Sequence, residues 1–229
     1  MLNLFEYQVK NLTASPILTR RVDYGQPAWS PAYFIVPLVG AAVRRAIASH
    51  AVSADRGFKA LDVGCGEQPF RSCTESAGYQ YHGMDVTQNS KGTVDLIGAI
   101  DQPLSPAVTA LAPADLVLCT EVLVHVVDLQ TAFSNLSRLM RPGAAVIISC
   151  PFLFPLHEEP DDFWRPTRYA LQSLAAKHQF RVVEEESLGE ATDVLGTVLA
   201  GIWLGPWLCA ASDSGGASHL RLGYIWRTF

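Results

Sequence analysis

Short apolar runs rich in valine, leucine and isoleucine alternate with longer stretches of mixed polarity between residues 58 and 186. Runs of this kind are typical of strands buried on both faces, whereas the longer stretches carry apolar residues at the spacing of a helix. Regular alternation of the two is typical of a parallel sheet with helices on both faces. The pattern therefore predicts an α/β, doubly wound, Rossmann-like fold.

The same pattern gives bounds for each element. Strands are predicted at Phe58–Val63, Tyr79–Asp85, Val94–Ile97, Asp115–Cys119, Ala144–Cys150, Phe180–Glu186 and Leu220–Trp226, which together make a mostly parallel, seven-stranded sheet. Helices are predicted at Pro69–Ala77, Leu129–Met140 and Thr167–His178. Arginine, proline and glycine at positions 141–143 are typical of a helix end, so we expect them to stop the second helix.

Residues 1–50 have a different composition, with prolines at positions 16, 27, 31 and 37 before a helical stretch at Val36–Ser49. We interpret this segment as an N-terminal helical cap or lid on a catalytic domain of residues 51–229. Its aromatic residues Tyr24 and Trp29 either contact substrate or pack against the flank of the domain.

A second unusual segment, Val194–Ser212, contains no charged residue and approaches the length of about 20 residues that spans a bilayer. Glycines and Pro206 interrupt it, and it lies between stretches predicted to complete the fold. We interpret residues 188–216 as an apolar insert that is buried or covers the substrate. Membrane contact is therefore not expected.

Composition narrows the class of protein. A chain of 229 residues that is 49% hydrophobic can bury one sizeable core. Its net charge of −5, without a basic run, argues against a nucleic-acid partner. Five cysteines without a Cys-x-x-Cys pair and a polar N-terminal sequence favour a reduced, cytoplasmic location. A homodimer is left open.

The sequence LDVGCGEQP at residues 61–69 joins the first predicted strand to a predicted helix, where open α/β sheets bind ligands. A dinucleotide site would have a third glycine where Pro69 stands, and the carboxylates of Asp62 and Glu67 would repel a pyrophosphate. The same carboxylates would attract an ammonium or a sulfonium. S-adenosylmethionine carries both and no phosphate. An ordinary tight turn is the alternative for the glycines.

Two further acidic positions suit an adenosine ligand. Asp85 lies 19 residues past Gly66, close to the spacing of about 20 at which an acid reaches ribose hydroxyls. Its alternative role is a helix N-cap. Val86 beside it, and Ile100 with Asp101 after the third strand, are candidates for contacts with the adenosine, including the adenine face and amino group.

Three motifs together resemble the class I S-adenosylmethionine-dependent methyltransferases, in particular a small-molecule group of the methyltransferase type 11 kind. They are the Leu-Asp-Val-Gly-Cys-Gly loop, DLVLCTEVLVH at Asp115–His125, and RLMRPG at Arg138–Gly143. The resemblance spans residues 55–187. It implies methyl transfer to a small-molecule acceptor, with S-adenosylmethionine as cofactor and S-adenosylhomocysteine as product.

The resemblance also implies roles for individual residues. Asp62 would hold the amino group of the methionine part, and Asp85 would bind the ribose diol. The turn residues Gly64, Cys65 and Gly66 would let the ligand approach the backbone. Cys119, Thr120 and Glu121 would line the site near the methyl group. Glu121 could instead cap the next helix, and His125 is either a structural hydrogen-bonding group or a catalytic base.

The loop PFLFPLHEEPDDFWRPT at Pro151–Thr167 resembles a His-x-x-Pro-x-Asp-Tyr/Phe-Trp-Arg-x-Thr segment in a subset of these enzymes, many of them in glycan or secondary-metabolite pathways. Candidate substrate-binding residues in this loop are Phe152, His157, Asp162, Trp164 and Arg165. Arg165 either binds substrate or forms an ion pair, and Thr167 is expected to cap the following helix.

Methyl transfer from a sulfonium depends mainly on alignment and desolvation, so a base is needed only if the acceptor must lose a proton. For a hydroxyl acceptor the candidate base is His157, whose alternative role is a bond to loop backbone. No metal-ligand spacing is diagnostic, so no metal is predicted. Two other functions stay open: an NAD(P)-dependent oxidoreductase and a non-catalytic S-adenosylmethionine-binding partner subunit.

Overall fold

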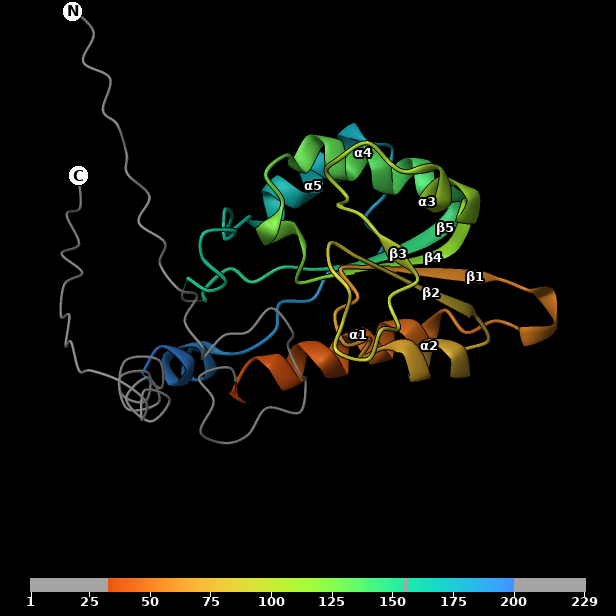
Figure 1. Ribbon diagram of the computed structural model, residues 1–229. Coiled ribbons are helices and arrows are strands. Elements are labelled where there is room, and N and C mark those ends of the chain that lie inside the picture. Colours follow the sequence, from red (N-terminus) through yellow and green to blue (C-terminus); the bar gives the residue numbers. More distant parts are fainter. Residues whose placement is uncertain (1–32, 155, 200–229) are drawn as a thin grey trace, which may run out of the picture.

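A computed structural model of the chain describes residues 33–154 and 156–199. At its centre lies a five-stranded sheet in the order β3-β2-β1-β4-β5, in which every pair of neighbouring strands is parallel (Figure 1). The strands are β1 (Lys59–Val63), β2 (Gln80–Asp85), β3 (Leu96–Ile97), β4 (Ala114–Thr120) and β5 (Met140–Ser149). The α/β fold and the first five predicted strands are confirmed.

Helices cover both faces of this sheet (Figure 1). Helices α1 (Val36–Ser49) and α2 (Arg71–Ser76) lie on one face, and α3 (Pro106–Leu111), α4 (Leu129–Leu139) and α5 (Arg168–Lys177) lie on the other. The described chain also contains two short 3-10 helices, η2 (Ala54–Arg56) and η3 (Leu123–His125). The helix predicted at residues 36–49 agrees with α1 at both ends.

Side-chain caps explain where three of the helices begin. Asp128 accepts hydrogen bonds from the backbone N–H groups of Gln130 and Thr131 at the start of α4 (2.9 and 3.1 Å). Thr167 caps α5 as expected. Ser105 caps α3, a helix that the apolar pattern did not predict. A serine followed by proline is nevertheless a helix-start signal that could have identified it.

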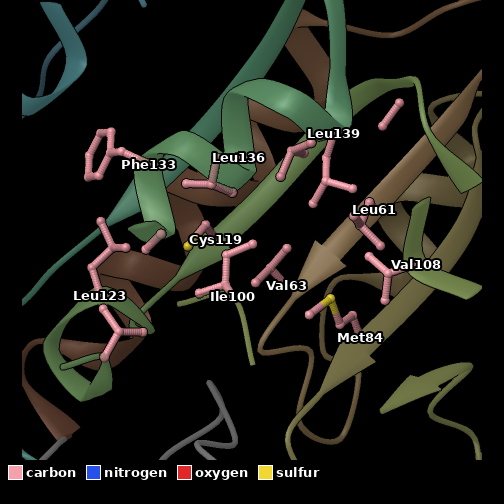
Figure 2. Close-up of a cluster of buried hydrophobic side chains, with 14 of the residues drawn as sticks. Leu61, Val63, Met84, Ile100, Val108, Cys119, Leu123, Phe133, Leu136 and Leu139 are labelled. Carbon is pink, nitrogen blue, oxygen red and sulfur yellow. The ribbon is translucent and has the colours of Figure 1, made fainter. Parts of the chain in front are cut away.

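Alternating side chains on the strands build one apolar layer on each side of the sheet. On the α4 side, Phe133 and Leu136 pack with Val63, Met84 and other side chains of the sheet (Figure 2). On the α1 side, a second buried cluster joins the helix to β1 and β4; its members include Val39, Val43, Ile47, Ala60, Leu116 and Leu118. The sheet is therefore rigid where its strands end, which is where a ligand site is expected.

The prediction of a sixth strand at Phe180–Glu186 is wrong, because this segment has no regular secondary structure and is not part of the sheet. A strand needs a neighbour for its backbone hydrogen bonds, and none of the described residues supplies one. Phe180 instead packs edge-on against Phe133, with ring centroids 6.2 Å apart, and the Glu186 carboxylate pairs with Arg45 of α1. The seventh predicted strand, at 220–226, lies outside the described residues.

The end of the helix predicted at Leu129–Met140 is confirmed to within one residue, but positions 141–143 lie in a strand. Helix α4 ends at Leu139, and these residues belong to β5 instead. The pairing of β4 with β5 is irregular at this point, Gly143 has a φ of +82°, and the Arg141 guanidinium forms an ion pair with Asp115 of β4. The ion pair stabilises this first part of β5 against β4.

The proposed cap and insert are described only in part. Tyr24 and Trp29 lie outside the described residues, as does residue 200 onward. Residues 191–199 are helical and lie beside the start of α1 (blue in Figure 1), where Gly196 faces the ring of Phe34. Of the helices that the structure describes, none combines the length and the apolar character that crossing a membrane requires.

Candidate active site

The turn after β1 requires its first glycine and leaves space at its second. The N–H groups of Gly64 and Cys65 both donate to the carbonyl of Met84 in β2 (2.8 and 3.0 Å), and Gly64 has a φ of +69°. A Cβ on Gly64 would lie 2.2 Å from a methyl group of Val122. Gly66 has a φ of +50°, and a Cβ there would meet nothing within 4 Å. The backbone at Gly66 is thus open to a ligand.

Asp85, at the end of β2, lies against this turn. One of its carboxylate oxygens accepts the N–H of Gly66 (2.9 Å), and the other accepts the N–H of Thr87 (3.3 Å). A loop, not a helix, follows Asp85, so the alternative role as a helix cap is wrong. The half-buried carboxylate is held in a defined position at the mouth of the glycine turn.

Asp62 is 1% exposed and lacks a partner for one oxygen. The hydroxyl of Tyr81 in β2 donates to its Oδ2 (2.6 Å), whereas its Oδ1 has no hydrogen-bond partner among the described residues. Burial raises the pKa of Asp62 to about 7; the Tyr81 hydrogen bond opposes this shift, and the charge of Asp85 adds to it. A buried, unpaired carboxylate oxygen of this kind favours a cationic ligand group.

A polar network that the sequence did not predict ties the loop after β2 to the glycine turn. The side-chain amide of Asn89, which is buried, donates to the carbonyl of Gly66 (3.1 Å). Glu67 accepts hydrogen bonds from both the N–H and the hydroxyl of Ser90 (3.1 and 2.9 Å). The carboxylate that was expected to repel a phosphate therefore also holds this loop.

The end of β4 contributes a strained, half-buried glutamate. Glu121 has a φ of +59°, and its carboxylate accepts a hydrogen bond from the Ser149 hydroxyl (2.6 Å). Burial raises the pKa of Glu121, while the Ser149 hydrogen bond and the charges of His125 and Arg165 oppose the shift. Glu121 does not cap a helix: the residue preceding η3 is Val122, and Asp128 caps α4.

His125 is held by the loop at residues 151–167. Its Nδ1 donates to the carbonyl of Asp161 (2.6 Å), which agrees with the structural hydrogen-bonding role that was the alternative to a catalytic base. Its Nε2 lies 3.9 Å from a carboxylate oxygen of Glu158, and its ring meets that of His157 edge-on at 5.0 Å. The rings of His125 and His157 therefore pack against each other.

A buried carboxylate orients His157. The side chain of Asp162 is 1% exposed, lies 3.2 Å from Nδ1 of His157 and accepts the His157 backbone N–H (2.9 Å). The Arg165 guanidinium donates to both Asp162 oxygens (2.5 and 2.8 Å), so Arg165 makes the ion pair that was the alternative to substrate contact. Burial alone would raise the pKa of Asp162, but the hydrogen bonds from Arg165 and His157 outweigh it and lower the pKa.

Hydrogen bonds to backbone carbonyls attach the loop at residues 151–167 to η3 and to the residue after it. The N–H of Phe163 donates to the carbonyl of Val124 (2.8 Å), and the Trp164 indole N–H donates to the carbonyl of Val126 (2.8 Å). Trp164 thus has a structural contact that the sequence did not indicate.

Asp101, which was expected to contact the adenine, accepts hydrogen bonds from the backbone N–H groups of Val127 and Asp128 (3.0 and 3.4 Å).

Most of the predicted site residues line one cleft of about 1890 Å³, which also extends along β5 and α1. The cleft is lined by Asp62, Gly64, Cys65, Gly66, Asp85, Val86, Ile100, Asp101, Thr120, Glu121, His125, Phe152 and His157. Asp162, Trp164 and Arg165 do not line it. Cys119 does not line the cleft, because it is fully buried on the α4 side of the sheet (Figure 2). Neighbouring residues on a strand face opposite sides of the sheet.

Within the described residues, no three histidine, cysteine, aspartate or glutamate side chains come together in a way that could hold a metal ion. The paired histidines and the carboxylates around them are connected instead by hydrogen bonds and ion pairs.

Comparison with known proteins identifies the family. The sequence matches the methyltransferase domain family over residues 39–193, well over half of the chain. The chain belongs to this methyltransferase family. The expected membership of the class I S-adenosylmethionine-dependent methyltransferases is thereby confirmed.

Individual relatives of this methyltransferase are distant. A ubiquinone biosynthesis O-methyltransferase from Methylococcus capsulatus is 32% identical over 102 residues, which cover 41% of this chain and 43% of that enzyme. The match thus spans less than half the length of this curated relative.

Solved structures share the fold of this methyltransferase. An S-adenosylmethionine-dependent methyltransferase from Archaeoglobus fulgidus superposes with a TM-score of 0.51 at 16% identity, covering 72% of this chain and 86% of that one. The [4+2]-cyclase SpnF superposes with a TM-score of 0.55 at 16% identity, covering 85% and 73% of the two chains. At these identities the likeness shows a common fold alone.

The contact between Gly64 and Val122 generates a test of the turn. We expect Gly64→Ala to lower the free energy of unfolding by about 1–3 kcal/mol, because the new methyl group overpacks a site whose backbone has a positive φ. Urea denaturation measures this change. Gly92→Ala is the matched control, since Gly92 has a similar φ of +67° but nothing within 4 Å. An equal loss in the two variants would contradict the role of the contact.

Proposed function

We propose that this chain uses S-adenosylmethionine to methylate a small-molecule acceptor, with oxygen as the favoured acceptor atom. The observation that carries the proposal is the buried Asp62 carboxylate with an unpaired oxygen, at a glycine turn whose other flank holds Asp85. This cradle combines an anionic group for an ammonium with an open backbone and a second carboxylate. It offers no cation for a phosphate among the residues that line the turn.

The cofactor residues have distinct tasks in this proposal. Asp62 accepts the amino group of the methionine part on its unpaired oxygen, and Asp85 accepts the ribose hydroxyls. Gly66 leaves space for the ligand beside the backbone. Val86 and Ile100 line the neighbouring part of the cleft, where an adenine ring would pack.

The acceptor half of the cleft supports proton removal. S-adenosylmethionine supplies a methyl group on a sulfonium, a good leaving group, so the protein's residues mainly align the acceptor and exclude water. Asp162 faces Nδ1 of His157, which directs the other ring nitrogen to the acceptor hydroxyl as a general base. Arg165 keeps Asp162 ionised, and an ionised Asp162 stabilises the imidazolium that forms.

The acceptor belongs to a neutral or weakly acidic class in this proposal. Glu121 and Glu158 bring negative charge near the two histidines, which disfavours an anionic acceptor, and Phe152, 55% exposed, adds an apolar wall. A glycan precursor or secondary metabolite with a free hydroxyl group fits this class. The curated relative in ubiquinone biosynthesis is also an O-methyltransferase.

Two readings compete with this one. An NAD(P)-dependent oxidoreductase would place a pyrophosphate beside the carboxylates of Asp62 and Glu67. A non-catalytic partner subunit would bind the cofactor without turnover. The neighbour SpnF, a [4+2]-cyclase, illustrates that this fold does not by itself determine the reaction.

Labelled methyl donor can test the function directly. A cell extract incubated with the protein and S-adenosylmethionine carrying an isotopically labelled methyl group should yield a product heavier by one labelled methyl, detected by mass spectrometry. Binding of S-adenosylhomocysteine without any labelled product would favour the partner subunit. Tight binding of NAD(H) with none of S-adenosylhomocysteine would favour the oxidoreductase.

Replacement of Asp85 tests the ribose contact. We expect Asp85→Ala to weaken S-adenosylhomocysteine binding by about 1.5–3 kcal/mol, roughly 10- to 150-fold, because charge-assisted hydrogen bonds are lost. Isothermal titration calorimetry measures this affinity. Asp95→Ala is the matched control: Asp95 accepts the N–H of Gly83 (2.8 Å) but does not line the cleft. Unchanged affinity in folded Asp85→Ala would remove Asp85 from the site.

Replacement of His157 tests the base. We expect His157→Ala to lower the turnover number by about 10²–10⁴-fold while the affinity for S-adenosylhomocysteine stays nearly constant. Turnover is followed by release of S-adenosylhomocysteine once an acceptor is known. His178→Ala serves as control, because His178 contacts Gln130 and does not line the cleft. Equal turnover in the His157 variant and the wild type would exclude a base at this position.

A further inference from the structure

The surroundings of Asp62 are unusual for a buried acid. From β2, Tyr81 donates its hydroxyl to Oδ2 and Asp85 adds negative charge. From the glycine turn and from β4, the neighbouring groups are the thiols of Cys65 and Cys119. No described lysine or arginine forms an ion pair with Asp62. The guanidinium of Arg71 lies over the Tyr81 ring, 5.4 Å from its centroid, and forms an ion pair with Glu75.

From this arrangement we infer that Tyr81 is a positioning residue, which presents the unpaired oxygen of Asp62 to the amino group of the ligand, and that binding releases one proton from Asp62. The inference rests on the proposed function, because it concerns the same site. It gives Tyr81 a role and adds the release of a proton from Asp62, neither of which is part of the proposed function.

The geometry gives each carboxylate oxygen one task. The hydroxyl of Tyr81 donates to Oδ2 of Asp62. When Asp62 is protonated in the absence of ligand, its proton therefore lies on Oδ1. An ammonium group brings its own N–H donors and cannot share Oδ1 with that proton. The protonated carboxyl and the ligand ammonium therefore become a carboxylate–ammonium pair, and the displaced proton passes to solvent. No bond to carbon or sulfur changes in this step.

The two thiols and the tyrosine hydroxyl beside Asp62 do not exchange protons near neutral pH. Burial, followed by the charge of Asp62, raises the pKa of the Cys65 thiol to about 12, and the same two causes raise that of Cys119 to about 12. Burial, followed by the charge of Asp62, also raises the pKa of Tyr81. All three groups stay protonated near neutral pH, so none of them supplies the proton that leaves Asp62.

The sign of the pH effect follows from the competition. The ligand ammonium binds the ionised form, so affinity is complete above the pKa of the empty site, which is about 7, and falls as the pH is lowered through it. Tyr81 stabilises the ionised carboxylate, so its removal raises that pKa. Loss of one charge-assisted hydrogen bond should move the midpoint of the affinity profile upward by about one to two pH units.

Calorimetry can count the proton. S-adenosylhomocysteine is titrated into the wild-type protein between pH 5.5 and 9, in buffer pairs with different ionisation heats. We expect release that approaches one proton per ligand below pH 7 and vanishes toward pH 9. 5′-Methylthioadenosine, which lacks the amino group, is the matched ligand and should bind without release. Binding of both ligands with equal proton release would overturn the inference, whereas failure of both to bind would overturn the proposed function.

Variants assign the effect to Tyr81. In Tyr81→Phe the midpoint of affinity against pH should move upward while affinity at pH 9 changes only a few-fold. Tyr79→Phe is the control: it removes another buried tyrosine hydroxyl, one that donates to the carbonyl of His50 (2.6 Å). Coincident midpoints in the wild type and both variants would overturn the role of Tyr81. If Tyr81→Phe does not fold, Asp62→Asn decides the proton balance: it should abolish proton release, and persistent release would overturn the inference.

Discussion

The burial of Asp62 with a single hydrogen bond is the constraint on which the site depends. A carboxylate in this position destabilises the empty protein unless it is protonated or paired, because it has lost water without gaining a full set of partners. Parallel strands make the position possible, since β1, β2 and β4 all end at the same edge of the sheet. In the proposed function, the ammonium group of the ligand is the missing partner of this carboxylate.

The second half of the site follows the opposite principle. Asp162 is also buried, but Arg165 and His157 satisfy it, so it stays ionised and acts on its neighbours. One buried acid is thus left open for a ligand and the other is closed for orientation. Asp62 lies in β1 of the sheet, whereas Asp162 lies in a loop that hydrogen bonds attach to Val124 and Val126.

Sequence alone predicted the parts of the fold whose burial is set by local pattern. Five strands and α1 agree with the predicted elements, because the apolar runs of the strands lie between helices on both faces of the sheet. The segment at 180–186 has a similar run, but forming a strand depends on a neighbour and not on the run itself. For the site, Asp62 and Asp85 could be placed at one cleft because parallel strands share an edge.

Contacts that depend on register could not be predicted in this way. The bonds of Tyr81 with Asp62 and of Ser149 with Glu121 join different strands, and nothing in a single sequence fixes how those strands are aligned. The alternation of β4 could have shown that Cys119 and its neighbour Thr120 face opposite sides, so that only one of them reaches the cleft.

The attachment of the loop at residues 151–167 to η3 has a consequence for grafting. Phe163 and Trp164 bond to backbone carbonyls of η3 and of the residue that follows it, and Val122, just before η3, lies against the first glycine of the turn after β1. These acceptors are main-chain carbonyls, which every residue carries, so the donors decide whether a transplanted loop can be anchored. Such a loop keeps both bonds only if it has a backbone N–H at position 163 and an indole N–H at position 164.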